Sequence, residues 1–219
     1  MQISIANVLT AEQVTALRIA LAGVTFKDGR ATAGWAAALV KNNEQAVHDV
    51  RIETLVEDTV ASVLANPVFK TAVQPKRVSK ALFSRYRPGS AYGLHVDNAL
   101  MDGDRTDVSF TLFLSDPASY DGGELVLQTL AGEDAIKLPA GGLFAYPSTT
   151  LHKVTEVTRG ERLALVGWIR SHVRSAEQRE LLFDLESARL ALFERHGKTQ
   201  EFDLLSKTAA NLMRMWVDD

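Results

Sequence analysis

Apolar positions at helical spacing dominate the first third of the chain. Residues 10–22 carry them three or four positions apart, behind Thr10 and Gln13, which have the spacing of a capping box. Residues 50–64 repeat the helical period up to an Asn-Pro pair that is typical of a helix end. The stretch between these two helices, 27–45, holds glycines and an Asn pair and is predicted to be a loop or an irregular extension.

The pattern changes at residue 77. From there to residue 171, short runs rich in β-branched and aromatic residues are separated by Pro and Gly turns. About eight strands with no helix between them predict a double-stranded β-helix, or jelly roll, whose inner face can hold a small-molecule site. The predicted strands are residues 78–87, 92–96, 108–114, 124–128, 135–138, 143–146, 152–158 and 162–169.

Helical spacing returns after residue 171. Ser175 and Gln178 have the spacing of another capping box, apolar residues recur behind them up to His196, and a last helix is predicted over 200–216. We expect both helices to serve as packing elements or as a dimer surface. The fold class is therefore predicted to be α+β, with an N-terminal helical support region at 1–76, a jelly-roll domain at 77–174 and a C-terminal helical region at 175–219.

Composition excludes several classes of protein. The 219 residues are 46% hydrophobic and 23% charged with a net charge of −3, which is typical of a folded protein and argues against a nucleic-acid partner. The chain has no cysteine, so metal donors must be nitrogen and oxygen. It shows neither a signal-like N-terminus nor a stretch of about 18 apolar residues, so we expect a cytoplasmic protein without a membrane partner.

His95, Asp97 and His152 are the candidate metal ligands. In an extended strand, residues 95 and 97 project to one face about 7 Å apart at Cα, so both can bind one ion. His152 would come from a neighbouring strand. Two imidazoles and one carboxylate form the donor set that holds one face of a non-haem Fe(II) and leaves positions open for oxygen chemistry. The alternative is a chance His-x-Asp pair whose histidine caps backbone groups.

Short motifs follow one another along the strand-rich region. They are Tyr86-x-Pro88-Gly89, Tyr92-x-x-His95-Val96-Asp97-Asn98, Thr111-Leu112-Phe113-Leu114-Ser115, Gly122-Gly123-Glu124-Leu125, Pro147, His152-x-Val154 and Arg162. In these motifs residues 86–170 resemble the Fe(II)- and 2-oxoglutarate-dependent dioxygenases of the prolyl and lysyl hydroxylase type. Similarity to the bacterial PKHD-type hydroxylases extends over nearly the full length, through Thr32-Ala33-Gly34, Val40-Lys41-Asn42-Asn43, Leu138-Pro139-Ala140-Gly141 and the helical tail containing residues 181–185.

The resemblance implies a metal centre and a cosubstrate site. His95, Asp97 and His152 would bind Fe(II) as the catalytic centre, leaving three positions for two oxygens of 2-oxoglutarate and one water or O₂. Arg162 would pair bidentately with the distal carboxylate of 2-oxoglutarate, because a planar guanidinium matches a planar carboxylate. The alternative for Arg162 is a surface charge beside Glu161.

The tyrosines before the first histidine have two interpretations. Tyr86 and Tyr92 would hydrogen-bond the cosubstrate or the metal ligands, or they are core tyrosines with satisfied hydroxyls. Some animal prolyl hydroxylases have a tyrosine that contacts the cosubstrate, and the residues around Leu112 offer no clear counterpart. We expect Gly122 and Gly123 to be structural, in a turn where a side chain would clash.

The implied reaction hydroxylates an unactivated C–H while 2-oxoglutarate is decarboxylated to succinate and CO₂. It requires Fe(II), 2-oxoglutarate and O₂, with L-ascorbate as a candidate reductant for oxidised iron. The substrate, a small molecule or a peptide, is not identified by the sequence, and a homodimer is a plausible assembly. Residues 27–45 and 99–106 are candidate lids.

Two alternative functions stay open at this point. One is another jelly-roll metalloenzyme, an isomerase or a dioxygenase that does not use 2-oxoglutarate, since a fold alone does not fix the chemistry. The other is a non-catalytic module that senses iron or a small molecule. Arg162 argues against the first, because such enzymes do not need a fixed guanidinium beside the metal.

Overall fold

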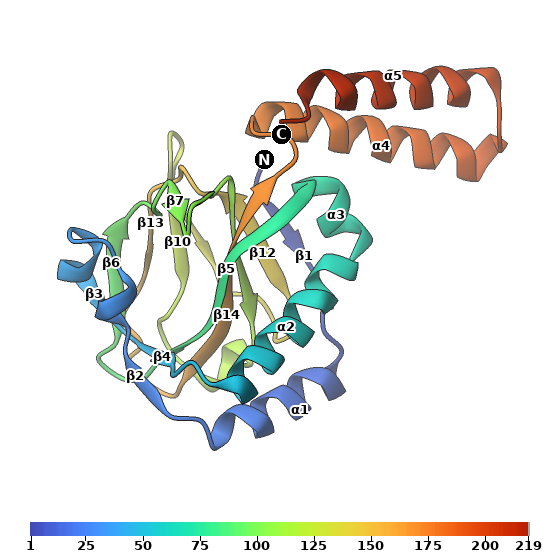
Figure 1. Ribbon diagram of the computed structural model, residues 1–219. Helices are drawn as coiled ribbons and strands as arrows, with labels where there is room; N and C mark the ends of the chain where they lie inside the picture. The colour runs from blue at the N-terminus through green and yellow to red at the C-terminus, as the bar shows by residue number, and fades with distance from the viewer. Residues whose placement is uncertain (219) are drawn as a thin grey trace.

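Two antiparallel sheets lie face to face in the computed structural model, which describes residues 1–218 (Figure 1). The larger sheet has the strand order β1-β12-β9-β14-β5-β4-β2, and the smaller has the order β11-β10-β13-β6-β3. The strands of the larger sheet are β1 (Ile3–Ile5), β2 (Phe26–Asp28), β4 (Glu44–Ala46), β5 (Pro75–Tyr86), β9 (Val108–Phe113), β12 (Leu143–Pro147) and β14 (Arg162–Ser171). Those of the smaller sheet are β3 (Lys41–Asn42), β6 (Ala91–His95), β10 (Leu125–Thr129), β11 (Gly132–Ile136) and β13 (His152–Val154), while β7 (Leu100–Met101) and β8 (Asp104–Arg105) form a separate ribbon.

Three helices cover the outer face of the larger sheet (Figure 1). They are α1 (Ala11–Ala22), α2 (Val50–Ala65) and α3 (Pro67–Val73). Strand β9 shows how the sheet divides its side chains: Val108 and Leu112 belong to the apolar core beneath the helices, while Ser109 and Thr111 line a cavity between the sheets. Alternation along a strand thus separates a structural face from a site-bearing face.

The jelly-roll prediction is confirmed, and each of the eight predicted strands has a counterpart. Strand β13 is shorter than predicted and ends at Val154. The prediction of a loop over residues 27–45 is wrong in part, because this stretch supplies most of β2 and β4 and all of β3, with short 3₁₀ turns at Gly29–Thr32 and Ala37–Val40. Strands of two or three residues hold too few positions for alternation to reveal them.

The predicted helices of the first third are also present. Thr10 and Gln13 form the capping box on α1. The Asn-Pro pair that ends α2 also begins α3, since the Asn66 side chain accepts from the backbone N–H of Phe69 and Pro67 occupies the first turn. A proline needs no N–H partner there, so the same residue that stops one helix can start the next.

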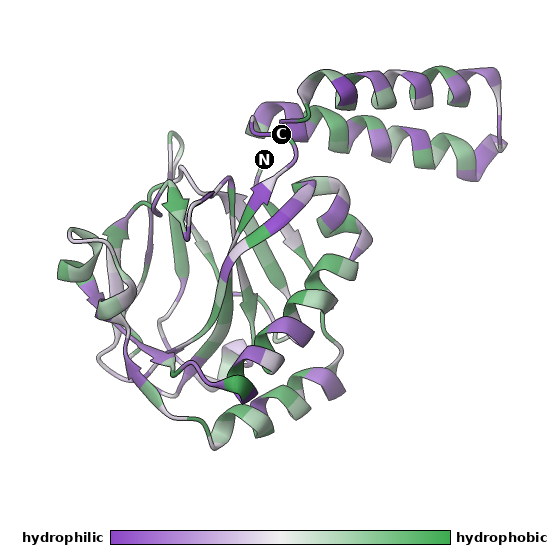
Figure 2. Ribbon diagram, viewed as in Figure 1, coloured by the Kyte–Doolittle hydropathy of each residue, from purple (hydrophilic) through white to green (hydrophobic). Residues whose placement is uncertain are grey.

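The C-terminal helices form a hairpin that projects from the sheets (Figure 1). It consists of α4 (Ala176–His196), capped by Ser175, and α5 (Gln200–Trp216). The base of the hairpin is anchored by Arg179, which is buried and donates to the carbonyls of Val173 and Arg174. Apolar and polar residues alternate along both helices (Figure 2), yet α5 has no buried residue. Within residues 1–218, none of the helices combines the length and apolar character that crossing a bilayer requires.

Candidate metal centre and its cavity

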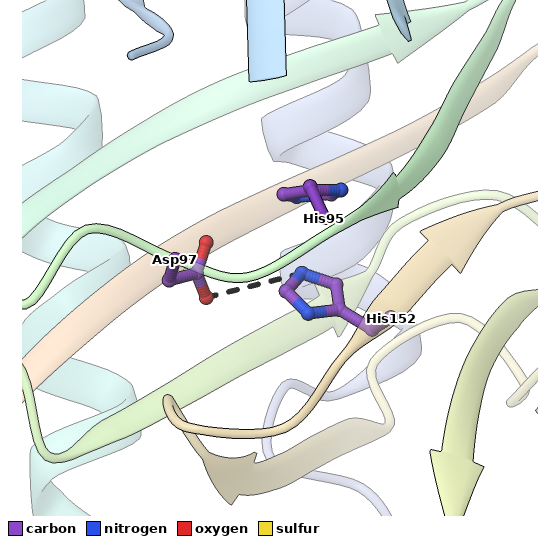
Figure 3. Close-up of side chains that lie close together, drawn as sticks. All are labelled: His95, Asp97 and His152. Atoms are coloured by element: carbon purple, nitrogen blue, oxygen red, sulfur yellow. Dashed lines mark ion pairs between the residues drawn. The ribbon is translucent and has the colours of Figure 1, made fainter. Parts of the chain in front are cut away.

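The two candidate histidine ligands lie opposite one another across the pair β6–β13. His95 is the last residue of β6 and His152 the first of β13, and the strand register pairs them directly. Their ring centroids are 4.2 Å apart. Asp97 lies two residues beyond the end of β6, and its Oδ2 is 3.8 Å from His152 Nε2. Figure 3 shows the three side chains converging, and the ligand atoms they offer lie within 4.8 Å of one another.

Backbone carbonyls orient both rings. His95 Nδ1 lies 2.8 Å from the carbonyl of Gly93, and His152 Nδ1 lies 3.0 Å from that of Thr150. A carbonyl only accepts, so each Nδ1 carries the proton and each Nε2 keeps its lone pair for a metal. A partner that fixes the tautomer in this way is typical of metal-binding histidines.

The carboxylate and one ring are held by further contacts. Ser109 donates to Asp97 Oδ2 at 2.6 Å and lies 2.8 Å from the hydroxyl of Ser148. Tyr92 stacks on His95 with a centroid separation of 3.6 Å. Burial, followed by the nearby His152, lowers the pKa of His95 to about 4. The ring is therefore neutral near pH 7, which is the form that binds a metal.

Arg162 is buried in the same cavity without an acidic partner. It is 1% exposed, and its Nε and Nη1 atoms have no hydrogen-bond partner among residues 1–218. Its guanidinium lies 5.0 Å from the ring of Tyr86 and 5.4 Å from that of Phe113. Leaving buried N–H groups of a cation unpaired is costly, so this arrangement fits an anion that enters the cavity and accepts from them.

The two predicted tyrosines lie in the cavity wall at different places. Tyr86 ends β5 directly opposite Arg162, and burial raises the pKa of its hydroxyl although Arg162 opposes the shift. Burial also raises the pKa of Tyr92, beside His95. Both phenols stay protonated near neutral pH and can donate hydrogen bonds.

The structure adds cavity residues that the sequence did not single out. Tyr146 is buried with its ring centroid 5.1 Å from that of His152, and burial, followed by Asp97, raises its pKa well above the usual range. Lys41 is buried beside Tyr92. Trp168 lines the cavity and is half-buried. Only the strand register brings these residues together; the motif Val40-Lys41-Asn42-Asn43 contains Lys41 but does not reveal its place in the cavity.

The missing tyrosine near Leu112 also has a structural explanation. Leu112 points into the core beneath the helices and cannot reach the cavity. Near Arg162, the buried hydroxyl of Tyr120 has no hydrogen-bond partner in the part of the chain that the structure describes, and burial raises its pKa while Arg162 opposes the shift. Gly123 separates the two: a Cβ at this position would lie 3.0 Å from both Arg162 Cδ and Tyr120 Cε2. The predicted structural role of Gly122 and Gly123 is confirmed.

The cavity that joins these groups measures about 260 Å³. Both sheets line it, as do parts of the two candidate lids, including Ala37 from residues 27–45 and Met101 from residues 99–106. Closure of these segments over a substrate stays a prediction. Two imidazoles, one carboxylate and a separate buried guanidinium fit Fe(II) and a dicarboxylate, a combination that defines an iron-dependent oxygenase on a jelly-roll scaffold.

Comparison with known proteins gives the same class. Residues 81–170 match the model of the 2OG-Fe(II) oxygenase superfamily. The chain is 52% identical to a PKHD-type hydroxylase of Picosynechococcus over 97% of both chains, and 50% identical to one of Maricaulis maris over the full length of both. Among solved structures, a Pseudomonas putida prolyl-4-hydroxylase is 25% identical with a TM-score of 0.54, covering 78% of this chain and 92% of its own.

A more distant structure shares the fold. HygX from Streptomyces hygroscopicus, solved with nickel, 2-oxoglutarate and hygromycin B, has a TM-score of 0.57 at 16% identity, over 78% of this chain and 84% of its own. The chain belongs to the PKHD-type hydroxylases of the 2OG-Fe(II) oxygenase superfamily. It is a 2-oxoglutarate-dependent dioxygenase that uses Fe(II), 2-oxoglutarate and O₂, rather than a sensing module or an oxygenase independent of 2-oxoglutarate.

Proposed function

We propose that the enzyme hydroxylates an unactivated C–H bond at the centre formed by His95, Asp97 and His152. In this proposal the three side chains bind Fe(II), and Arg162 binds the distal carboxylate of 2-oxoglutarate. The observation that carries the assignment is the buried guanidinium with two unpaired N–H-bearing nitrogens, in the same cavity as the three metal donors. A bidentate ion pair would satisfy it.

The chain's own groups position the reactants. When bound, Fe(II) with 2-oxoglutarate and O₂ supplies the oxidising power, and 2-oxoglutarate leaves as succinate and CO₂. The Gly93 and Thr150 carbonyls hold the two Nε2 atoms toward one point, and Ser109 holds the carboxylate of Asp97. Such fixed donors keep the open coordination positions in one place.

The two tyrosines have distinct proposed roles. Tyr86 would donate its hydroxyl proton in a hydrogen bond to the cosubstrate, a role supported by its place opposite Arg162. Tyr92 would fix the plane of His95 by stacking, with its hydroxyl available to the cosubstrate or the metal ligands.

The Arg162 assignment is tested by the affinity for 2-oxoglutarate. Calorimetry on the Mn(II)-loaded protein should show binding weakened by about 100-fold in Arg162→Gln, the loss expected for a charge-assisted pair of about 3 kcal/mol. Arg195→Gln, at the exposed end of α4, removes the same charge elsewhere and should bind like the wild type. Equal affinity in Arg162→Gln would assign the distal carboxylate to another residue.

A reductant, a cellular location, a substrate and an assembly state complete the proposed function. We propose L-ascorbate as the reductant that restores oxidised iron, a cytoplasmic location where metabolism supplies 2-oxoglutarate, and a small molecule or a peptide as substrate. The net charge of −3 supports the absence of a nucleic-acid partner, and we propose no membrane partner. Exposed apolar residues on the C-terminal hairpin support a homodimer.

A further inference from the structure

The cavity is longer than 2-oxoglutarate requires. Arg162 pairs with Tyr86 across β14 and β5, and Trp168 pairs with Lys80 on the same two strands. The two pairs are six positions apart along each strand, which places them about 20 Å apart, with all four side chains on the same face. A five-carbon diacid spans about 7 Å at most, so one held by Arg162 leaves the Trp168 end of the cavity free.

Lys41 brings a buried positive charge into this cavity from the smaller sheet. It lies on β3 opposite Tyr92, is 8% exposed, and its Nζ lies 5.0 Å from the centroid of the Tyr92 ring. Its one hydrogen bond is to Thr32 Oγ1 at 3.2 Å, an interaction that leaves the charge uncompensated. Within residues 1–218, neither Lys41 nor Lys80 forms a salt bridge.

The charges around Lys41 change when the metal site is filled. Asp97 and Asp28 attract its ammonium, Lys80 repels it, and burial lowers its pKa to about 8, so it is mostly charged near pH 7. A divalent ion bound by Asp97 would cancel the larger of the two attractions. Asp28 already pairs with Arg30, so the loaded site would hold two neighbouring ammonium groups with little compensating negative charge from this chain.

Trp168 adds a hydrogen-bond donor beside Lys80, its partner in the strand register. It lines the cavity, and its indole Nε1–H is buried without an acceptor among the described residues. An indole nitrogen can only donate, so it also requires a group that accepts. The two lysines and the tryptophan thus present three donors without a carboxylate partner, and the indole N–H has no acceptor among the described residues.

We propose that the primary substrate carries an anionic group, a carboxylate or a phosphate, which binds between Lys41 and Lys80 and accepts from the indole N–H of Trp168. The inference rests on the proposed function, because it places the anion at the opposite end from the cosubstrate. Binding there would hold the rest of the substrate over the metal centre, which lies in the same cavity.

Matched probes test the charge requirement. N-acetyl amino acids and N-acetyl-phosphoserine amide are titrated into the anaerobic Fe(II)–2-oxoglutarate enzyme, each against its neutral counterpart, the N-acetyl amino-acid amides and N-acetyl-serine amide, while the metal-to-ligand charge-transfer band is followed. At least one anionic probe should bind about tenfold more tightly than its neutral counterpart. The carboxylate and phosphate arms identify which anion is preferred.

Variants test whether Lys41 and Lys80 cause the preference for the anionic probe. Lys41→Met with Lys80→Gln should reduce the preference to within about twofold, whereas Lys207→Met, an exposed charge on α5, should keep it. Calorimetric affinity for 2-oxoglutarate should stay unchanged in the double variant. A loss of that affinity instead, with the anion preference intact, would show that the lysines serve the cosubstrate and would overturn the proposal.

Tryptophan fluorescence requires no metal and therefore tests the anion site independently of the proposed function. Tryptophan fluorescence of the metal-free protein should respond to the preferred anionic probe and lose that response in Trp168→Phe. Equal responses to charged and neutral probes, or no response to any anion at about 10 mM, contradict the anionic subsite. Failure of the charge-transfer band alone, with the fluorescence preference intact, contradicts the proposed function and leaves the subsite supported.

Discussion

Gly123 does not line the cavity, but its lack of a side chain leaves room for Arg162, which does. Its φ of +69° lies in the left-handed region, and an added Cβ would meet Val157, Arg162 and Tyr120 within about 3 Å. We predict that Gly123→Ala displaces Arg162 and weakens 2-oxoglutarate binding by about tenfold or more, with a backbone cost of about 1–2 kcal/mol in unfolding free energy. Calorimetry and urea unfolding measure the two effects.

Gly197 provides the matched control. Its φ is +67°, and no atom lies within 4 Å of an added Cβ. Gly197→Ala should also carry a backbone cost and leave the affinity for 2-oxoglutarate unchanged. If both variants bind 2-oxoglutarate like the wild type, packing at Gly123 does not position Arg162.

The depressed pKa of His95 makes the metal-free protein sensitive to acid. The pKa falls from 6.5 to about 4 on burial, so between these values the unfolded chain binds more protons than the folded one. Stability should therefore be fully present above about pH 6.5 and decline as the pH falls toward 4. Urea unfolding at about pH 7 and about pH 5 should show a smaller decline in His95→Asn than in the wild type.

His48→Asn, in an exposed loop, serves as the control for that experiment. It should decline with pH as the wild type does. An identical decline in His95→Asn would mean that protonation elsewhere accounts for the acid sensitivity.

The candidate metal ligands and Arg162 were predictable from sequence because each stands in a short motif with characteristic chemistry. Lys41 and Trp168 were not recognised as cavity residues, because their roles depend on which strand lies beside which. The pairing of Lys41 with Tyr92 and of Trp168 with Lys80 is a property of the register. A single sequence shows alternation along a strand but not its neighbour.

At the scale of elements, long periodic segments were predicted well and short ones were not. The prediction over 50–64 matches α2 to within one residue, because four turns of apolar periodicity leave little ambiguity. The two-residue strand β3 and the ribbon β7–β8 owe their existence to neighbours supplied by the folded chain. Residues of β3 and β7 line the cavity, so the part of the fold that shapes substrate access was the least predictable from the sequence.

The C-terminal hairpin leaves apolar side chains without a covering layer. Leu204 and Met215 on α5 are 51% and 74% exposed. If a second copy covers them, light scattering should give the mass of a dimer for the wild type and of a monomer for Leu204→Glu with Met215→Glu. Leu130→Glu, on a fully exposed turn between β10 and β11, should leave the dimer intact. A monomeric wild type would contradict the homodimer proposal.

Over the whole molecule, the two sheets supply different parts of the site. The smaller sheet supplies both histidines, and the larger sheet supplies Arg162 and its ring contacts. Helices on the outer face bury the apolar side chains of the larger sheet, so its inner face is free to carry polar groups. The distance between metal donors and guanidinium is therefore set by how the sheets pack, and a rigid frame of this kind pre-organises both halves of the site.

The central claim is that one cavity holds Fe(II) and 2-oxoglutarate together at His95, Asp97 and His152. An anaerobic titration of the metal-free protein with Fe(II) and then 2-oxoglutarate tests it most directly, with the metal-to-ligand charge-transfer band as the signal. The band should appear only after both additions and should be absent in His152→Ala. Iron binding without a band in the wild type, or an unchanged band in His152→Ala, would contradict the account.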